Sequence, residues 1–125
     1  MSNLIRVLFV DDNEDLRNMM CRLIDSAPGM KSAGSIESAD ALEAEVEKRN
    51  PDVVLIDLTM PGRSPLLAIH ALSKLGIRVK VVAYSGHDDP ETISSALDAG
   101  ASELVSKSLD PQSVVAAIRR ICAAK

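Results

Sequence analysis

The chain has 125 residues, of which 46% are hydrophobic and 26% are charged, and its formal net charge at pH 7 is -4. These values are typical of a single globular domain and exclude a disordered tail. The negative charge disfavours binding to nucleic acid or to an anionic membrane surface, because both depend on clustered Lys and Arg. No apolar run approaches the length of a membrane span, and the amino end lacks the pattern of a signal peptide, so we expect a cytoplasmic protein.

Strands and helices are expected to alternate five times along the chain. Short apolar runs rich in β-branched residues predict strands at 4–10, 53–57 and 79–84. Weaker patterns predict strands at 31–36 and 103–106. Apolar residues at helical spacing follow each run and predict helices near 13–27, 38–49, 64–75, 89–99 and from 110 onward.

Capping residues indicate where these helices begin. Ser38 is expected to cap the second helix through its hydroxyl group. A capping residue followed by proline at the first helical position, where the missing N–H costs nothing, occurs at Ser64-Pro65, Asp89-Pro90 and Asp110-Pro111. These pairs predict the starts of the third, fourth and fifth helices.

The alternation of buried strands with helices predicts the fold class. Parallel strands joined by right-handed crossovers form a sheet with helices on both faces, so we expect a doubly wound α/β fold. A single domain is expected to cover residues 1–125, with no effector domain in this chain. Cys21 and Cys122 lie in helical patterns without metal-ligand spacing and are expected to be buried thiols.

Polar residues stand at the carboxyl ends of four expected strands. They are Asp11-Asp12 after the first strand, Asp57 at the end of the third, Ser85-Gly86 after the fourth and Lys107 after the fifth. A single Asp at a strand end more often caps a turn through its side chain. The carboxyl ends of parallel strands share one edge of the sheet, however, so we expect these groups to converge there.

The acids at this edge call for a positive charge. Three carboxylates held together repel one another and raise one another's pKa values unless a cation neutralises them. All candidate ligands are oxygen atoms, which suits Mg²⁺ better than zinc. A carboxylate beside Mg²⁺ and a lysine can attack an activated phosphoryl group. Asp57 is therefore expected to become an aspartyl phosphate.

In their order and placement, these motifs resemble the receiver domain of two-component response regulators. The resemblance covers essentially the whole chain and rests on Asp11-Asp12, Asp57 with Met60-Pro61-Gly62, Ser85-Gly86, and Gly100-Ala101 followed by Lys107. It implies a flavodoxin-like strand order of 2-1-3-4-5. It also implies phosphorylation of Asp57 by a histidine kinase or a phosphotransfer protein, with self-phosphorylation and autodephosphorylation in place of turnover of an external substrate.

The resemblance also implies roles for the residues around the phosphoacceptor. Mg²⁺ would be held by Asp12, Asp57 and the Thr59 carbonyl, with Asp11 near it. Lys107 would contact the phosphoryl group. Both roles agree with the charge argument made from the residues alone.

A conformational switch is implied next to this site. Ser85, followed by Gly86, would supply a hydroxyl that moves toward the phosphate, because the phosphate adds charge and strong acceptors. The family's usual output surface corresponds to residues 90–124, which would contact a downstream effector or output domain. A phosphorylation-dependent homodimer through the same face is a further hypothesis.

Two positions depart from the family pattern. The aromatic residue usual on the fifth strand, whose ring swings inward when the hydroxyl moves, is replaced by Leu104, so the usual aromatic switch is not expected. The proline that commonly follows the lysine is replaced by Ser108, which predicts a looser last loop. Tyr84 is not expected to substitute for the missing aromatic residue, because alternation along the strand points it away from the site.

Thr59 and His87 carry two open interpretations. Each lies two residues beyond a site residue, Asp57 or Ser85, where family members border the route of the hydrolytic water. One hypothesis is that they tune the lifetime of the phosphate. The other is that they are an ordinary loop threonine and a solvated loop histidine.

Three other functions compete with the receiver interpretation. An aspartyl-phosphate phosphohydrolase of the haloacid-dehalogenase type needs an acid two residues after the nucleophile, where this chain has Thr59. A flavin or nucleotide binder is disfavoured because the chain has no Gly-rich phosphate loop and no stacking platform. An unphosphorylated interaction module with the same fold stays open, because Leu104 replaces the usual aromatic residue.

Overall fold

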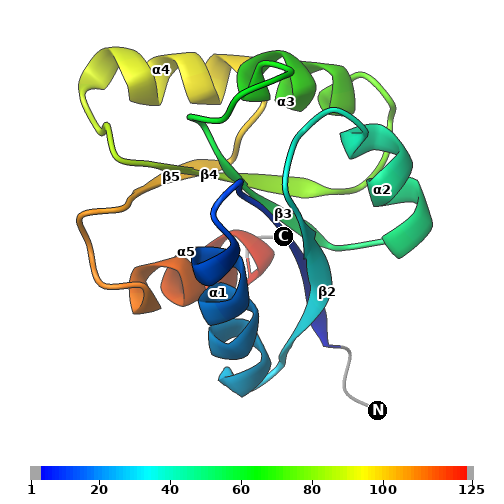
Figure 1. Cartoon of the computed structure of the whole chain (residues 1–125), viewed down its shortest axis with the longest axis vertical. Coiled ribbons are helices and arrows are strands. Elements are labelled where there is room, and N and C mark those ends of the chain that lie inside the picture. Colours follow the sequence, from blue (N-terminus) through cyan, green and yellow to red (C-terminus); the bar gives the residue numbers. More distant parts are fainter. Residues whose placement is uncertain (1–3, 124–125) are drawn as a thin grey trace.

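The computed structural model describes residues 4–123 and shows one twisted parallel sheet with helices on both sides (Figure 1). The elements in chain order are β1 (Ile5–Val10), α1 (Glu14–Ser26), β2 (Met30–Ile36), α2 (Leu42–Arg49), β3 (Val53–Asp57), α3 (Pro65–Ser73), β4 (Lys80–Ser85), α4 (Pro90–Ala99), β5 (Glu103–Ser106) and α5 (Gln112–Ala123). All four strand pairings are parallel, in the order β2-β1-β3-β4-β5. The predicted doubly wound fold and its strand order are confirmed.

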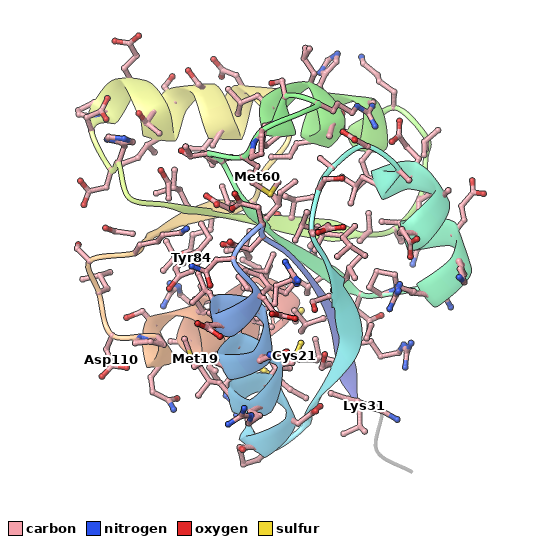
Figure 2. The ribbon with its side chains drawn as sticks, viewed as in Figure 1. Met19, Cys21, Lys31, Met60, Tyr84 and Asp110 are labelled. Atoms are coloured by element: carbon pink, nitrogen blue, oxygen red, sulfur yellow. The ribbon has the colours of Figure 1, made fainter. Side chains whose placement is uncertain are left out.

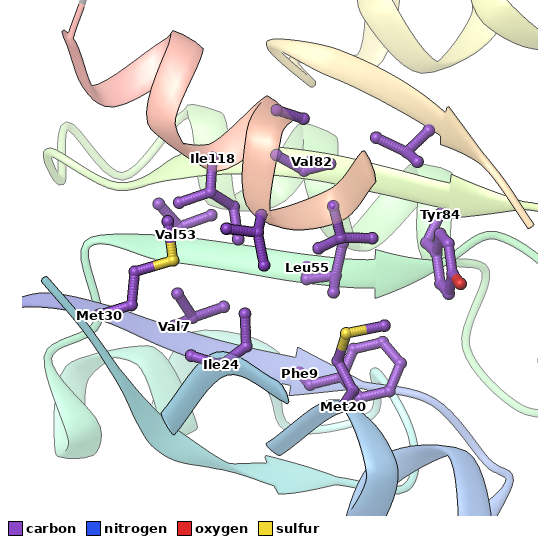
Figure 3. Close-up of a cluster of buried hydrophobic side chains, with 14 residues drawn as sticks. Val7, Phe9, Met20, Ile24, Met30, Val53, Leu55, Val82, Tyr84 and Ile118 are labelled. Carbon is purple, nitrogen blue, oxygen red and sulfur yellow. The ribbon is translucent and has the colours of Figure 1, made fainter. Parts of the chain in front are cut away.

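The sheet separates two hydrophobic cores. Helices α1 and α5 cover one face, and α2, α3 and α4 cover the other (Figure 1). Successive side chains of strand β3 point to opposite faces, so the strand contributes to both cores. Val53 and Leu55 pack toward α1 and α5, while Val54 and Ile56 pack toward α2, α3 and α4. We call these two layers the α1/α5 core, drawn in Figure 3, and the α2–α4 core.

Side-chain caps fix the starts of three helices. The side chain of Ser64 accepts a hydrogen bond from the Leu67 N–H, and that of Asp89 accepts one from the Thr92 N–H, as the sequence predicts. Asn13 caps α1 in the same way. Each such cap contributes about 1 kcal/mol to stability. The caps therefore fix where α1, α3 and α4 begin, after the loops that follow β1, β3 and β4.

The predicted start of the second helix is wrong. Helix α2 begins at Leu42, and its N-cap residue, Ala41, makes no side-chain capping bond. Ser38 instead accepts a hydrogen bond from the Asp40 N–H at 3.3 Å, within a turn. The Asp40 carboxylate accepts a hydrogen bond from the Arg63 N–H at 3.0 Å, which ties this turn to the loop after β3 and so competes with a helical start at Ser38.

The two cysteines are half-buried rather than fully buried. Cys21 lies on α1, where Figure 2 labels it, Cys122 lies on α5, and both are free thiols. Burial raises the pKa of the Cys122 thiol, which keeps this group protonated and unreactive near neutral pH. Among residues 4–123, no helix combines the length and the apolar character needed to cross a membrane.

Candidate functional site

The polar groups gather where β1, β3, β4 and β5 end. Parallel pairing sets Asp57 of β3 beside Tyr84 of β4, and Ser85 of β4 beside Ser106 of β5. The Lys107 N–H then donates to the Ser85 carbonyl at 2.7 Å, one residue beyond β5. Register alone thus brings the end of β5 to the carboxylate that ends β3.

Three carboxylates form the centre of the site. Asp11, Asp12 and Asp57 each place one carboxylate oxygen within 4.8 Å of the other two. Asp11 and Asp57 are only 1% and 2% exposed, whereas Asp12 is exposed. One oxygen of Asp57 accepts a hydrogen bond from the Thr59 N–H at 3.0 Å, and one oxygen of Asp11 accepts one from the Asn13 N–H at 2.9 Å. These bonds hold the first oxygen of each buried acid and leave the second, Oδ2, facing Lys107.

Lys107 bridges the two buried acids. Its Nζ lies 3.3 Å from Asp11 Oδ2 and 3.3 Å from Asp57 Oδ2. The strand end that carries Asp11 is itself held, because Arg17 donates from Nη1 to the Asp11 carbonyl at 2.9 Å. The lysine and the two acids therefore lie at the ends of three different strands, each held in place by hydrogen bonds.

The electrostatics of the cluster favour an additional cation. Burial raises the pKa of Asp57, and the neighbouring charge of Asp11 adds to this effect, although the Thr59 N–H and Lys107 oppose it. Burial alone would lower the pKa of Lys107, but the charges of Asp57 and Asp11 outweigh burial and raise it. When ionised, the three acids outnumber this one ammonium by two charges. A divalent ion would balance that excess.

The donor set fits Mg²⁺. The three candidate ligands are carboxylate oxygens, and hard oxygen donors suit Mg²⁺ rather than zinc. The three carboxylates line a pocket of about 360 Å³ that is open to solvent. Its lining residues are Asp11, Asp12, Asn13, Leu16, Asp57, Thr59, Gly86, His87 and Lys107. We call this hollow the acid pocket.

Ser85 lies beside the acid pocket rather than in its wall. It is 1% exposed, and its Oγ accepts a hydrogen bond from the His87 N–H at 2.9 Å. Its side chain lines a neighbouring pocket of about 390 Å³ next to α4. Thr59 and His87 line both pockets, whereas Gly86 lines the acid pocket only. The two loop residues with open interpretations thus form the rim between the two hollows.

The last loop has its own hydrogen bonds. Ser108, which stands where the proline was expected, donates its N–H to Ser106 Oγ at 3.2 Å, and the two hydroxyls lie 2.7 Å apart. Leu104 is half-buried against the α2–α4 core. The serine pair supports the backbone that precedes and follows Lys107.

Sequence reasoning placed Tyr84 wrongly. Tyr84 is 3% exposed in the α1/α5 core, and Lys107 Nζ lies 5.4 Å from the centre of its ring. Because Tyr84 pairs directly with Asp57, both side chains project from the same face of the sheet. The pairing register was the missing information, since alternation within one strand does not say which residue stands beside Asp57.

Arg63 was also missed. Its guanidinium contacts Glu43 through two bonds of 2.5 and 2.9 Å and reaches the Ala39 carbonyl at 3.3 Å. Together with the bond from its N–H to Asp40, these contacts fasten the loop after β3, which carries Thr59, to the start of α2. No local motif in the sequence signals such a long-range clamp.

The doubly wound sheet and the acidic edge define a flavodoxin-like α/β domain, and comparison with known proteins identifies its family. The sequence model of the response regulator receiver domain matches residues 7–119. The chain belongs to this family, the receiver domains of two-component response regulators.

Curated relatives support this assignment. Response regulator UvrY of Escherichia coli K12 is 31% identical over 118 residues, which is 94% of this chain and 54% of UvrY. Protein-glutamate methylesterase/protein-glutamine glutaminase 5 of Myxococcus xanthus is 42% identical over 106 residues, which is 82% of this chain and 30% of that protein. The chain thus spans about half or less of the length of these relatives.

Solved structures show the same architecture. A LuxR-family two-component response regulator from Aurantimonas sp. SI85-9A1 superposes with a TM-score of 0.91 at 29% identity, covering 98% of this chain and 88% of that one. The response regulator domain of Thermotoga maritima CheB gives a TM-score of 0.87 at 25% identity, covering 98% and 99%. Receiver domains attached to different proteins therefore share this fold.

Proposed function

We propose that this receiver domain accepts a phosphoryl group on Asp57 from a histidine kinase or a phosphotransfer protein. One observation carries the proposal: the buried carboxylate of Asp57 faces Lys107 Nζ at 3.3 Å at the floor of a pocket open to solvent. A buried acid is costly unless it has a task or a partner, and perturbed acids in clefts are typical of functional sites.

The chemistry follows from the two oxygens of Asp57. Oδ1 is held by the Thr59 N–H, and Oδ2 faces Lys107. The carboxylate attacks phosphorus, an O–P bond forms, and the N–P bond of the donor phosphohistidine breaks with its electron pair returning to the imidazole. The ammonium of Lys107 then pairs with the phosphoryl oxygens, so its charge stays compensated throughout.

Mg²⁺ would be held by Asp11, Asp12, Asp57 and the Thr59 carbonyl. It would supply positive charge that offsets the charge on the transferring oxygens. The residues themselves do the positioning: Asp11 stays oriented by the Asn13 N–H and by Lys107, which keeps the pocket open beside Asp57.

The response to phosphorylation is proposed to begin at Ser85 and Gly86. The Ser85 hydroxyl now accepts from the His87 N–H, and a phosphoryl group on Asp57 would offer it an acceptor in the adjacent pocket. Movement of this loop would alter the face formed by residues 90–124, of which Ala124 lies outside the described residues. Leu104, packed on the α2–α4 core, would fill the space where relatives use an aromatic ring.

That face is proposed as the contact surface for a downstream effector or output domain, or for a second copy of the chain. Gel filtration with and without a phosphate mimic tests the homodimer; an unchanged elution volume would discard it. The proposed reaction is self-modification rather than turnover of an external substrate. Nucleic acid and membranes are not proposed as partners of this chain, in keeping with its charge of -4.

Thr59 and His87 are proposed to tune the lifetime of the phosphate. Both line the rim shared by the two pockets, where they border any path of water to Asp57. The double variant Thr59→Ala, His87→Ala is expected to change the dephosphorylation rate. An unchanged rate would assign both residues to an ordinary solvated loop.

An unphosphorylated interaction module is the second candidate, favoured by Leu104 at the switch position. Incubation with Mg²⁺ and a small-molecule phosphodonor, followed by intact-mass measurement, separates the two. A gain of one phosphate that disappears in Asp57→Asn and in EDTA supports the receiver function. Absence of any gain in the unmodified chain supports the module.

A further inference from the structure

Lys107 has a neighbour besides its two carboxylates. Its Nζ lies 5.4 Å from the centroid of the Tyr84 ring and 3.3 Å from an oxygen of each buried acid. Its side chain keeps 30% of its surface exposed, so water competes for the ammonium. A cation within about 6 Å of a tyrosine centroid is attracted by the negative face of the ring. The ammonium is therefore bounded by two negative charges and one aromatic face.

We propose that Tyr84 is a positioning residue for Lys107, whose ring face holds the ammonium between Asp11 and Asp57. The consequence for phosphorylation rests on the function proposed above, whereas the placement of the lysine does not. A lysine side chain has four flexible carbon atoms and loses considerable rotamer freedom when it is held in one place. The Tyr84 ring beneath the ammonium limits the conformations of the Lys107 side chain. Less conformational entropy is therefore lost when Lys107 pairs with the phosphoryl group.

The ring can act as a support because it is itself fixed. Tyr84 is 3% exposed and belongs to the α1/α5 core. Its ring meets that of Phe9 edge-on, with centroids 6.2 Å apart and planes at 62°, an arrangement that aromatic pairs favour. Figure 3 shows Tyr84 at one end of the cluster of buried side chains, near Phe9 and Met20. The position of the ring is thus set by core packing rather than by the pocket.

The support differs from the aromatic switch that the family places on the fifth strand. That position is Leu104, on the side of the sheet covered by α2, α3 and α4, whereas Tyr84 is buried on the side covered by α1 and α5. Tyr84 and Ser85 are consecutive, so their side chains project from opposite faces of β4. At the end of β4, Tyr84 would therefore hold the lysine, and the next residue, Ser85, would respond to the phosphate.

Three variants test the ring without removing any proposed ligand or nucleophile. Tyr84→Leu removes the aromatic face, Tyr84→Phe keeps it without the hydroxyl, and Val53→Ala shortens a buried side chain of the same core at the far end of the cluster from Tyr84 (Figure 3). The first readout is the NMR shift of the Lys107 ε-methylene protons. A ring face beneath them moves these signals upfield, which a purely structural role of Tyr84 would not do.

The upfield shift is expected in the unmodified chain, in Tyr84→Phe and in Val53→Ala, and it is expected to be lost in Tyr84→Leu. The phosphorylation rate with a small-molecule phosphodonor should fall by roughly 3- to 30-fold in Tyr84→Leu, and much less in the other two. Ordinary Lys107 shifts in the unmodified chain, or equal slowing by Val53→Ala, would overturn the proposal. If the unmodified chain takes no phosphate, the proposed function fails while the NMR shift still decides where the lysine sits.

Discussion

The two faces of the sheet contribute differently to its polar edge. On the face covered by α1 and α5, the buried acids Asp11 and Asp57 are already paired with Lys107, which rests on the Tyr84 ring. On the face covered by α2, α3 and α4, Ser85 contacts its own loop and borders an open pocket. The groups proposed to react, Asp57 and Lys107, are thus preorganised on one face. Ser85, which is proposed to respond to the phosphate, has space to move on the other face.

This division places the connection between the faces in β4. Tyr84 and Ser85 follow one another there, and Leu58 N–H donates to the Tyr84 carbonyl at 3.1 Å, linking the ends of β3 and β4. A change at Asp57 therefore reaches both faces through adjacent residues. We therefore expect larger effects from changes to the paired groups on the face covered by α1 and α5 than from changes on the opposite face.

The largest effect is expected from Lys107→Ala. Within residues 4–123, this variant removes the one ammonium that contacts both buried acids, so charge on the transferring oxygens loses its compensating partner. Removal of one such donor typically costs about 100-fold or more in rate. Phosphorylation of Asp57 followed by intact mass should slow accordingly. Lys80→Ala, at the exposed amino end of β4, is the matched control, and equal slowing by both variants would contradict the role of Lys107.

Mg²⁺ should stabilise the chain through the same face. At a concentration 100-fold above its dissociation constant, a ligand that binds only the folded state adds about 2.7 kcal/mol to the free energy of unfolding. The chain has one tyrosine and no tryptophan, so the intrinsic emission of Tyr84 can follow both the titration and urea unfolding. Asp57→Asn should lose most of this gain, whereas Asp98→Asn, at an exposed position on α4 outside the acid pocket, should keep it. A gain that survives in Asp57→Asn would place the ion elsewhere.

Without metal, the burial of Asp57 should lower the stability of the fold by an amount that depends on pH. Burial raises the pKa of Asp57, so the folded state favours the protonated acid, and its ionisation destabilises the fold as the pH rises through the folded-state pKa. In EDTA at pH 7, Asp57→Asn is therefore expected to be more stable than the unmodified chain. The difference in free energy of unfolding, measured with urea, should shrink as the pH falls. A constant difference at every pH would show that Asp57 does not carry this penalty.

The sequence was most informative where local chemistry decides the structure. Strand β3 and the placement of Asp57 were predictable because a short apolar run ends at an acid, and the caps at Ser64 and Asp89 because capping preferences act within three residues. The charge argument at the sheet edge also needed only the order of the strands. The roles assigned to the individual site residues stay predictions, to be tested by the variants described here.

Long-range contacts account for what the sequence did not reveal. Ser38 has the right chemistry for a helix cap, but Asp40 is engaged by Arg63, so the turn continues and α2 starts at Leu42. The position of Tyr84 beside Asp57 was missed for a similar reason, because it depends on the register between β3 and β4. Register and clamps join residues far apart in the chain, so no window of neighbouring residues contains them.

The smallest effect is expected at the clamp on the other face. Arg63 lowers the pKa of Glu43 through a direct side-chain bond, so the stability of this pair is present at neutral pH and is lost as the pH falls through the folded-state pKa of Glu43. Both side chains are about 30% exposed, at 28% and 32%, so Glu43→Gln should lower the free energy of unfolding by only about 0.2–1 kcal/mol.

Glu45→Gln is the matched control, because Glu45 pairs with Arg49 within α2 and does not contact the loop after β3 in any recorded bond. If the clamp holds that loop, Glu43→Gln should increase amide hydrogen exchange at Thr59 and Met60, whereas Glu45→Gln should leave those amides unchanged. The Asp57 and Lys107 shifts should change little in either variant, because these residues are held by contacts on the opposite face. A large disturbance of Lys107 by Glu43→Gln would show that the two faces are not mechanically separate, and that the paired site depends on the clamp.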